Sequence, residues 1–467
     1  MNFNYSKLLS ASALLLCLVF ACTISCSEIK TPGQTYYVNS ETGDDNNDGL
    51  SKEKAWKTLE AASQITYGPG DKLLLASGCT FNGKLDLRAS GDTENPVIVT
   101  GYDANNGKTG LPVIDAKGYV AAIRLMNATN IRISDLELTS DAGEPVDSKA
   151  RLERYGVWIV RDTAGKSEHI SLKNLYIHDI FASESRNDSE APNGQSNQGA
   201  GIWYRNTSNQ RILNNLTIEN CRIEMTGRDG MRIRGNPEAT DGLTVVNNKL
   251  KNIGGPGIVV THQSNAVIRG NVTDHTGYSG DPRQHGRGSG IWTNTLENGL
   301  IEKNINKHAR GIMDSYGIHI DIGCRNVVVQ YNLSVDNIGG FVQILGSNHN
   351  CAYRYNISVN DGWRRKGIDS PYHTALVKIS GYMGSKPEKG PFNSYIYNNT
   401  VYFNADKNET ARFHLTDSAD GVLIANNIFY LLGGAGVHPA AKNSFTANNV
   451  VFTHNLFTSE NLMPSIF

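Results

Sequence analysis

One short pattern of apolar and polar positions recurs nine times along this chain, in most copies directly after a glycine. The second residue of each copy is apolar, and so is the fourth in all copies but one, which has Thr293, whereas the third and fifth vary in chemistry. The copies are the segments 156–160, 201–205, 230–234, 257–261, 290–294, 317–321, 341–345, 376–380 and 412–416. Because successive side chains of a strand point to opposite faces, the pattern predicts short strands with one apolar face.

A second repeat lies upstream of most copies, and its centre is an asparagine between two short apolar runs. Its asparagines are Asn174, Asn248, Asn271, Asn304, Asn332, Asn356, Asn399, Asn427 and Asn455, with Asp135 and Cys221 in two further slots. Repeats spaced by roughly 20 to 50 residues are typical of solenoids, whose units bury their apolar faces by stacking. Short alternating runs favour a β-solenoid with three strands in each rung. The asparagine amides are expected to stack as a ladder that satisfies buried polar groups.

The third residues of the nine copies are expected to form one column that stands in water, one side chain for each rung. They are Trp158, Trp203, Arg232, Val259, Trp292, His319, Gln343, Lys378 and His414, with Arg205, Arg234, Asn294 and Asp321 beside them. Long connections such as 275–289 and 360–374 precede some of these strands and are expected to wall the column into a groove. Such a surface is suited to holding a ligand.

These two repeats resemble the right-handed parallel β-helix of the pectate-lyase-like proteins, which include polysaccharide lyases and glycoside hydrolases. The resemblance covers roughly residues 110 to 460, and the segment Tyr36-Tyr37-Val38 with Gly43 to Gly49 also resembles family members. It implies an all-β, right-handed parallel β-helix in which the asparagine ladder lies at the second turn. It also implies that substrate lies on the first sheet, beneath the third-turn loops. The fold alone does not choose the reaction, because it hosts several chemistries.

Length and composition agree with one long solenoid. The chain has 467 residues and a formal net charge of −1, which offers no general attraction to nucleic acid. We expect a signal segment over residues 1–26, a cap with the first strands over 27–118, and a β-helix of about ten to eleven rungs over 119–467. A helix over Ser51–Ile65, with Ser51 as its N-cap, is expected to cover the open end. We expect a monomer.

The N-terminal segment predicts export. Lys7 precedes an apolar run from Leu8 to Ala21, which is short for a membrane-spanning helix and typical of a secretory signal. Cys22 and Cys26 both resemble lipidation sites of bacterial lipoproteins, and the polar residues after Cys26 favour that cysteine. We therefore expect a cell-envelope protein, an outer-membrane lipoprotein or a periplasmic or extracellular protein, whose only membrane contact is a lipid anchor. A plain cleaved signal is the alternative.

No metal site or cofactor is expected. Asp44, Asn46 and Asp48 copy the first half of a calcium loop, but Ala55 stands where the bidentate Glu belongs. A polar turn is therefore favoured over a Ca²⁺ site. His178, His275 and His308 share one position after the asparagine strand, which indicates a polar rung edge. Cys221 is expected to be a buried thiol.

The candidate chemistry gathers on the rungs around His319. Asp321 on the strand and Asp314 at the preceding loop exit could form the carboxylate pair of a glycosidase, ~5 Å apart for retention or ~6.5 to 9.5 Å for inversion. His319 could relay a proton. Asp229, at an equivalent loop exit three rungs lower, resembles part of the Asp-Gly step of polygalacturonases. We expect a glycoside hydrolase with Asp321, Asp314, His319 and Asp229 as candidate catalytic residues.

Substrate is expected to be a polysaccharide or oligosaccharide held along the column. The candidate binding residues are Trp158, Trp203, Arg205, Arg232, Arg234, His285, Trp292, Asn294, Gln343, Trp363 and Lys378. Three of the five tryptophans lie on the column, where their rings could stack on sugars.

Two alternatives stay open. A lyase would need a cation on a uronate carboxylate and a base such as Lys378 or His319. The basic residues are spread, however, since Arg232 stands three rungs from His319. A glycan-binding solenoid without activity would need only the tryptophans, so the cluster of aspartates and histidine favours an enzyme.

Overall fold

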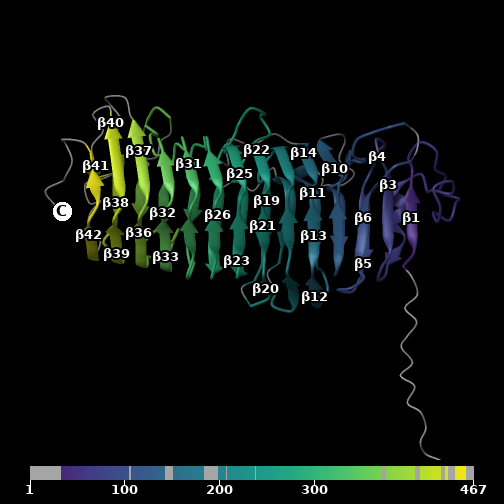
Figure 1. The fold of residues 1–467 in the computed structure, drawn as a ribbon, viewed down its shortest axis with the longest axis horizontal. Helices are drawn as coiled ribbons and strands as arrows, with labels where there is room; N and C mark the ends of the chain where they lie inside the picture. Colours follow the sequence, from purple (N-terminus) through teal and green to yellow (C-terminus); the bar gives the residue numbers. More distant parts are fainter. Residues whose placement is uncertain are drawn as a thin grey trace, which may run out of the picture. The chain divides into compact units, whose positions relative to one another are not determined.

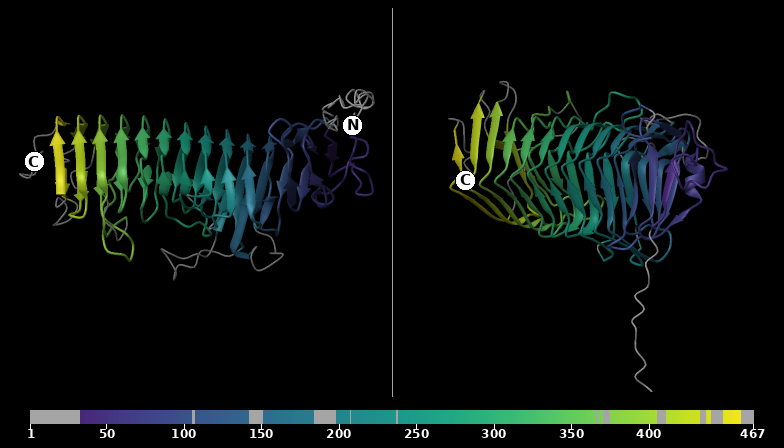
Figure 2. Two further views of the ribbon diagram at one scale, coloured as in Figure 1. Left: turned by 90° about the horizontal axis from the view of Figure 1, so that it is seen from below. Right: turned by 45° about the vertical axis from the view of Figure 1, so that its right-hand side comes forward.

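The computed structural model describes residues 33–104, 107–141, 151–183, 198–206, 208–236, 238–365, 367–369, 375–404, 411–432, 437–439 and 448–458. From Gly33 onward these residues form one compact unit. Its strands stack in three parallel sheets along a common axis (Figure 1; Figure 2), which confirms the predicted all-β parallel β-helix. Among the described residues, no helix has the length and apolar character needed to cross a membrane.

Each rung contributes one strand to each sheet. The leading sheet consists of β1 (Thr35–Val38), β3 (Lys72–Ala76), β6 (Val97–Tyr102), β9 (Ile131–Ser134), β13 (Ile170–Lys173), β17 (Thr217–Glu219), β21 (Thr244–Val246), β24 (Val267–Arg269), β27 (Leu300–Glu302), β30 (Val328–Gln330), β33 (His349–Arg354), β36 (Phe392–Tyr397), β39 (Asp420–Ala425) and β42 (Asn448–Thr453). The trailing sheet consists of β4 (Thr80–Asn82), β7 (Val113–Asp115), β10 (Glu137–Asp141), β14 (Tyr176–Phe181), β18 (Arg222–Thr226), β22 (Lys249–Ile253), β25 (Val272–Thr276), β28 (Ile305–Lys307), β31 (Leu333–Val335), β34 (Ile357–Val359), β37 (Thr400–Asn404), β40 (Ile428–Leu432) and β43 (Leu456–Phe457).

The third sheet, which we call the groove sheet, holds the nine recurring segments. It consists of β2 (Thr66–Tyr67), β5 (Leu85–Ala89), β8 (Ala121–Met126), β11 (Glu153–Val160), β15 (Gln198–Arg205), β19 (Met231–Arg234), β23 (Ile258–Ser264), β26 (Ile291–Glu297), β29 (Ile318–Ile320), β32 (Val342–Ile344), β35 (Val377–Ile379), β38 (Ala411–Leu415) and β41 (Val437–Pro439), with β12 (Gly165–Glu168), β16 (Arg211–Asn214) and β20 (Thr240–Asp241) beside this path. The apolar positions of its strands, such as Ile202, Ile291 and Ile318, are buried in the core between the sheets.

The asparagine ladder is present from Asn248 to Asn455, as predicted. Each side-chain amide donates to the Oδ1 of the next asparagine at 2.9–3.0 Å, and that oxygen also accepts from the backbone N–H of the rung before. Cys221 occupies the slot before Asn248, since its backbone N–H donates to Oδ1 of Asn248 at 2.9 Å. Its thiol is free and buried.

The prediction was wrong for Asn174 and Asp135, which lie outside the ladder. Both have a positive φ, 53° and 57°, and they hydrogen-bond to each other at the surface. The buried neighbours Leu175 and Leu136 follow them. Asn and Asp are favoured in this left-handed conformation, so the turn before the slot carries the same residue types as the slot itself.

The glycine that opens most copies of the pattern is required by close packing between rungs. A Cβ on Gly230 would lie 2.6 Å from the carbonyl oxygen of Gly257, and one on Gly290 would lie 2.6 Å from that of Gly317. Any side chain at these positions would push the rungs apart. The groove sheet therefore depends on glycine at the start of each central strand.

The N-terminal end differs from the prediction in its helix. The helix α1 spans only Leu59–Ser63, and its N-cap is Thr58, whose hydroxyl accepts from the Ala61 N–H at 3.3 Å. The predicted N-cap, Ser51, instead accepts from the Lys54 N–H and closes a turn. Residues 51–54 form bends and a turn, and Trp56 makes a parallel β-bridge to Val38, so the helix can begin only after Trp56.

Strands before residue 119 already pair into all three sheets. The described residues contain thirteen or fourteen strands along each sheet path, and eleven of them on each path follow residue 119. Asp44 and Asp48 accept hydrogen bonds from backbone N–H groups within their own turn, which fits the polar turn favoured over a calcium loop. Residues 1–26, including Cys22 and Cys26, lie outside the described residues, so the lipid anchor stays a prediction.

Candidate active site on the groove sheet

The predicted column is present and longer than expected. Strand register places in one line Asp86, Arg124, Trp158, Trp203, Arg232, Val259, Trp292, His319, Gln343, Lys378 and His414. The side chains of each strand alternate, so this line stands opposite the core-facing residues. Two charged residues, Asp86 and Arg124, extend it toward the N-terminal end.

The prediction that these side chains stand in water is wrong at four positions. Trp203, Val259, His319 and Gln343 have exposed fractions of only 8%, 0%, 3% and 3%. Tyr155 stacks on Trp203, with ring centroids 5.1 Å apart, and Trp292 stacks on His319 at 5.8 Å. Neighbouring aromatic rings therefore cover much of the column, which leaves a smaller and more enclosed site.

Asp321 lies directly after β29, where its backbone N–H donates to the Thr293 carbonyl at 2.8 Å. Its Oδ2 accepts from Trp292 Nε1 at 3.0 Å and from Asn294 Nδ2 at 3.4 Å. Its Oδ1 lies 3.9 Å from Nε2 of His319. Two donors on one oxygen fix this carboxylate in position, as a catalytic carboxylate requires.

Asp314 lies seven residues earlier, in a left-handed backbone conformation with φ 54°. Its Oδ2 accepts from Arg287 Nε at 2.9 Å, and its carbonyl accepts from the Arg364 guanidinium at 3.1 Å. Burial opposes ionisation, but the charge and hydrogen bond of Arg287 and the charge of Lys378 favour it, and the pKa of this carboxyl lies below its usual range. Asp314 is therefore ionised at neutral pH.

His319 stands between the two aspartates along the chain. Its Nε2 is buried and has no hydrogen-bond partner among the described residues. Burial lowers the pKa of the imidazole, and the charges of Asp321 and Asp314 oppose this only partly. The ring is therefore neutral at pH 7, with a nitrogen available to a ligand or to a proton.

Lys378 lies two strands further along the column, beside Gln343. Burial lowers its pKa, whereas the charges of Asp314 and Asp321 raise it. Because both carboxylates act on both Lys378 and His319, these four groups lie within electrostatic reach of one another. The predicted convergence of aspartates, histidine and lysine is therefore present.

Asp229 is fully buried and bound to Arg232. Arg232 Nε donates to Oδ2 at 2.6 Å, and its terminal nitrogen donates to Oδ1 at 3.1 Å. The Arg232 guanidinium lies 5.8 Å from the Trp203 ring and 5.7 Å from the Trp292 ring, reaching across the small residue Val259. Asp229 therefore anchors Arg232, and both of its oxygens are occupied by that contact.

A pocket of ≈ 190 Å³ opens beside these groups, and we call it the catalytic pocket. It is lined by Arg228, Arg232, Pro256, His285, Arg287, Gly288, Trp292 and Asp314. His285 lines it as predicted. Arg228 and Arg287 were missing from the predicted site residues, because they lie in irregular connections where no repeat marks a position. Arg228 could have been found from its place next to Asp229 at the loop exit.

A family model described as a right-handed beta helix region matches residues 118–358. The chain belongs to this right-handed β-helix family. The predicted resemblance is thereby confirmed, including the hand of the helix.

Two individual relatives are also similar to this β-helix chain. The lacto-N-biosidase of Bifidobacterium longum subsp. longum is 27% identical over 491 aligned positions, covering 85% of this chain. This chain spans only 29% of the length of that relative. The crystal structure of the GH136 lacto-N-biosidase from Eubacterium ramulus has a TM-score of 0.61 and is 20% identical, covering 91% of this chain and 68% of that chain. Its selenomethionine derivative gives a TM-score of 0.62.

Other predicted binding residues of this β-helix protein lie away from the catalytic pocket. Arg205, Arg234, Thr261 and Asn294 are register partners on successive strands. The two arginines therefore lie on the line of Asn294, toward the N-terminal end of the sheet. Trp158 lies four strands from Trp292 and packs against Tyr155 at 5.7 Å. These residues share the sheet with the pocket but do not line it.

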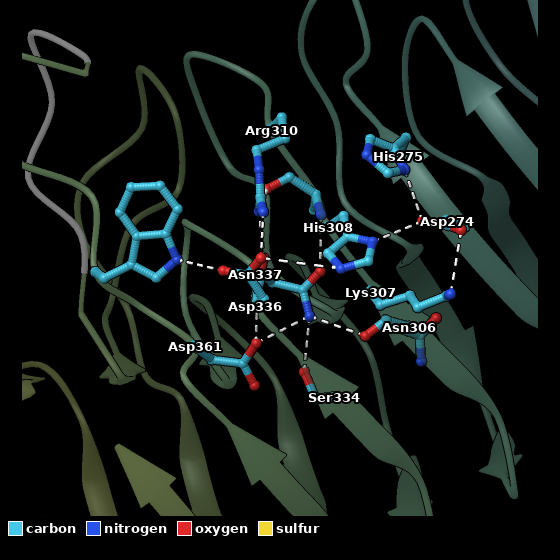
Figure 3. A network of polar contacts seen from close by, with 12 residues as sticks. Asp274, His275, Asn306, Lys307, His308, Arg310, Ser334, Asp336, Asn337 and Asp361 are labelled. Atoms are coloured by element: carbon cyan, nitrogen blue, oxygen red, sulfur yellow. Dashed lines mark hydrogen bonds and ion pairs between the residues drawn. The ribbon is translucent and has the colours of Figure 1, made fainter. Parts of the chain in front are cut away.

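The structure does not bring Trp363 to the site, contrary to the prediction. Its Nε1 donates to Asp336 at 2.8 Å, and the Arg310 guanidinium lies over its ring at 5.4 Å. Its partner Asp336 belongs, with Arg310 and His308, to a polar network that follows the trailing sheet (Figure 3). Its position in a long loop before a groove strand indicated a wall of the groove, but the chain turns it toward Asp336.

The same network contains the one group among the described residues whose side chains could together hold a metal ion, Asp274, His275 and His308. Both histidines hydrogen-bond through Nδ1 to the same Oδ1 of Asp274, at 2.7 and 2.8 Å. Lys307 Nζ lies 3.2 Å from the other oxygen. These mutual contacts already account for the arrangement (Figure 3).

Proposed function

We propose that this protein is a glycoside hydrolase whose carboxylate pair is Asp321 and Asp314. The observation that carries the proposal is that Asp314 lines the catalytic pocket beside Trp292, whose indole N–H binds Asp321 next to His319. Glycosidases need one carboxyl group to protonate the leaving oxygen and a second to attack the sugar or to activate water. The lacto-N-biosidase names of both relatives support the same reaction class.

Each neighbour of the pair has a role that follows from its contacts. The N–H groups of Trp292 and Asn294 hold Asp321 in one orientation, while Arg287 favours the ionised form of Asp314. The neutral His319 ring keeps an unpaired nitrogen 3.9 Å from Asp321, where it can exchange a proton with substrate or carboxylate. Arg228 and Arg232 supply donors for sugar oxygens in the catalytic pocket.

The proposed substrate is an oligosaccharide with a lacto-N-bioside unit, because both relatives are lacto-N-biosidases. The catalytic pocket of ≈ 190 Å³ is small, and aromatic, cationic and anionic side chains all line it. Because it is smaller than the roughly 300 Å³ of an ordinary small-molecule site, it suits about one sugar ring, with Trp292 beside that ring.

The test is hydrolysis of para-nitrophenyl lacto-N-bioside by the wild type and by Asp321→Asn and Asp314→Asn. Each variant is expected to lose about 10²- to 10⁴-fold in kcat while still binding the substrate. Asp241→Asn is the matched control, because Asp241 is an exposed carboxylate on β20 away from the pocket. Azide rescue would then assign the two roles. Full activity of Asp321→Asn would refute the proposal. An equal loss of activity in a correctly folded Asp241→Asn control would refute it as well.

A second candidate function, a polysaccharide lyase, is favoured by one observation. Arg228, Arg232 and Arg287 all line the catalytic pocket, although the sequence separates Arg232 from His319 by three rungs. Such a cluster of cations could neutralise a uronate carboxylate before β-elimination. Ultraviolet absorbance of unsaturated products from uronate-containing polysaccharides would reveal this reaction, and reducing ends without absorbance would favour hydrolysis.

We also propose that the chain is exported and anchored through a lipid on Cys26. The support is the apolar run from Leu8 to Ala21 and the polar residues that follow Cys26. Palmitate labelling of a bacterial culture is expected to be lost in Cys26→Ser and kept in the control Cys22→Ser. The reverse pattern would place the anchor on Cys22. Absence of label on the wild-type protein would favour a signal segment that is cleaved without lipidation.

A further inference from the structure

We infer that the groove sheet carries a second carbohydrate-binding site near its N-terminal end, which holds a remote part of the same glycan chain. The inference rests on the proposed function and adds a preference for long oligosaccharides. The site is a pocket of ≈ 150 Å³, which we call the distal pocket. Lys84, Asp86, Tyr119, Val120, Arg124 and Trp158 line it.

The polar wall of the distal pocket is fixed before any ligand arrives. Asp86 has an exposed fraction of only 8%, and Arg124 donates to its two oxygens at 2.8 and 2.7 Å. Lys84 Nζ donates to the same carboxylate at 2.9 Å. These contacts use two nitrogens of Arg124, whereas a guanidinium has five N–H donors. The arrangement offers oriented donors to sugar hydroxyls at little cost in side-chain entropy.

The apolar wall consists of aromatic rings. The ammonium group of Lys84 lies 5.6 Å from the centroid of the Tyr119 ring, and Trp158 stands on the neighbouring strand to Arg124. A pyranose ring combines an apolar C–H face with hydroxyls at its edge. It therefore matches a pocket that joins two partly exposed aromatic rings to a guanidinium.

The distal pocket also adjoins a larger hollow. A second pocket of ≈ 440 Å³ shares Lys84, Asp86 and Tyr119 with it and reaches Thr58 and Gln64 at the N-terminal helix. The two pockets together leave room for more than one sugar ring. Neither pocket contains a residue of the carboxylate pair, so this region has no part in bond cleavage.

The register ties the distal pocket to the catalytic pocket. Asp86, Arg124 and Trp158 lie on the same column as Trp292, and Trp158 is four strands away from it. At ~4.8 Å for each strand the separation is roughly 19 Å. An extended oligosaccharide that follows the column from the catalytic pocket would reach the distal pocket after a few sugar units.

The test measures binding to the full chain carrying Asp321→Asn, which prevents turnover. The probes are fluorescently labelled disaccharide, tetrasaccharide and hexasaccharide that each end in lacto-N-biose, together with oligosaccharides from chitin and galactan. Tyr119→Ala is expected to weaken binding of the longest bound probe about fivefold to tenfold, the usual range for loss of one aromatic contact. The loss is expected to shrink as the probe shortens. Lys84→Met provides a second variant in the same pocket.

The control is Tyr331→Ala, since Tyr331 is 52% exposed and stacks on Tyr355 beside the leading sheet. Equal binding by the Tyr119 and Tyr331 variants, or a loss that does not depend on probe length, would overturn the inference. Binding that depends on Tyr119 without any hydrolysis by the wild type would refute the proposed function and keep the second site. Hydrolysis by the wild type, with binding that is unchanged in the Tyr119 and Lys84 variants, would support the proposed function and refute the second site.

Discussion

The indole N–H of Trp292 donates a hydrogen bond of 3.0 Å to Oδ2 of Asp321, across two adjacent strands of the groove sheet. The same ring stacks on His319 with an angle of 15° between the planes, and the Arg232 guanidinium, which reaches across Val259, lies 5.7 Å from its centroid. Trp292 thus serves as a wall of the catalytic pocket and as a donor to the carboxylate. The two uses can be separated, because phenylalanine keeps the aromatic face and lacks the donor.

Trp292→Phe is therefore expected to lower kcat about 10- to 100-fold, the range for losing a hydrogen bond to a charged group, with a smaller change in KM. Steady-state kinetics on para-nitrophenyl lacto-N-bioside would measure both constants. Trp56→Phe is the control, since Trp56 also donates its indole N–H, to the Asn47 carbonyl, far from the pocket. A Trp292 variant as active as this control would mean that the donor contributes nothing to the reaction.

Arg287 controls the protonation of Asp314. The charge of Arg287 and its hydrogen bond to Oδ2 hold the pKa of the Asp314 carboxyl low, so Arg287→Gln is expected to raise that pKa. Removal of one adjacent cation shifts a carboxyl by about one unit or more. The limb of the pH profile of kcat/KM that Asp314 sets is therefore expected to move to higher pH by about one unit.

Arg283→Gln is the matched control for this profile. Arg283 lies in the same connection and pairs with Asp281 at 2.8 Å, not with Asp314. Its pH profile is expected to keep both limbs of the wild type. Superimposable profiles for the Arg287 variant and the wild type would show that Asp314 does not titrate in the reaction.

A buried carboxyl below the trailing sheet gives the protein a pH-dependent stability. Burial raises the pKa of Asp361 to about 7, although its Oδ1 accepts from the Asn337 amide at 2.9 Å (Figure 3). In the unfolded chain the pKa returns to about 3.9. Between these pH values the folded protein binds more protons, so this residue makes the free energy of unfolding fall as pH rises from 4 to 7.

Asp361→Asn is expected to remove this dependence, because an amide can continue the contacts to Asn337 and Ser358 without a charge. Relative to the wild type, the variant should gain stability between pH 5 and pH 8, on the order of 1.4 kcal/mol for each unit of pKa difference. Urea unfolding at both pH values measures the gain, and Asp241→Asn serves as an exposed control. A difference from the wild type that stays constant with pH would show that Asp361 is already ionised in the folded state.

The sequence was sufficient for the fold and for the line of residues on the groove sheet. Alternation fixes which side of a strand each residue faces, so Trp292 and His319 could be placed in one column without coordinates. The ladder from Asn248 onward was equally readable. The prediction was wrong at Asn174 because the turn before each slot has a positive φ, which also favours asparagine.

Exposure and loop position could not be predicted in the same way. His319 is buried because Trp292 and Tyr316 pack around it, and such covering depends on contacts between rungs. Arg228 and Trp363 lie in irregular segments that carry no repeat, so only the fold shows that one reaches the pocket and the other does not. Periodicity is informative about strands and silent about the loops that complete a site.

The ladder itself provides the sharpest test of what holds the rungs together. Oδ1 of Asn304 accepts from both the backbone N–H and the side-chain amide of Asn271, and its own amide donates to Asn332 and to the Ile268 carbonyl. Asn304→Ala would leave several of these buried groups unpaired. A buried group without its partner costs about 1–3 kcal/mol, so we expect the free energy of unfolding to fall by about 3 kcal/mol.

An exposed series of asparagines supplies the control for this prediction. Asn298 donates to Asn265 at 3.3 Å and accepts from Asn326 at 3.0 Å, but it is solvated and has a φ of 52°. Asn298→Gly suits that backbone conformation and is expected to change stability by less than about 1 kcal/mol. Urea denaturation of the two variants would compare them directly. Equal losses would mean that the buried amides stabilise the rungs no more than the surface series does.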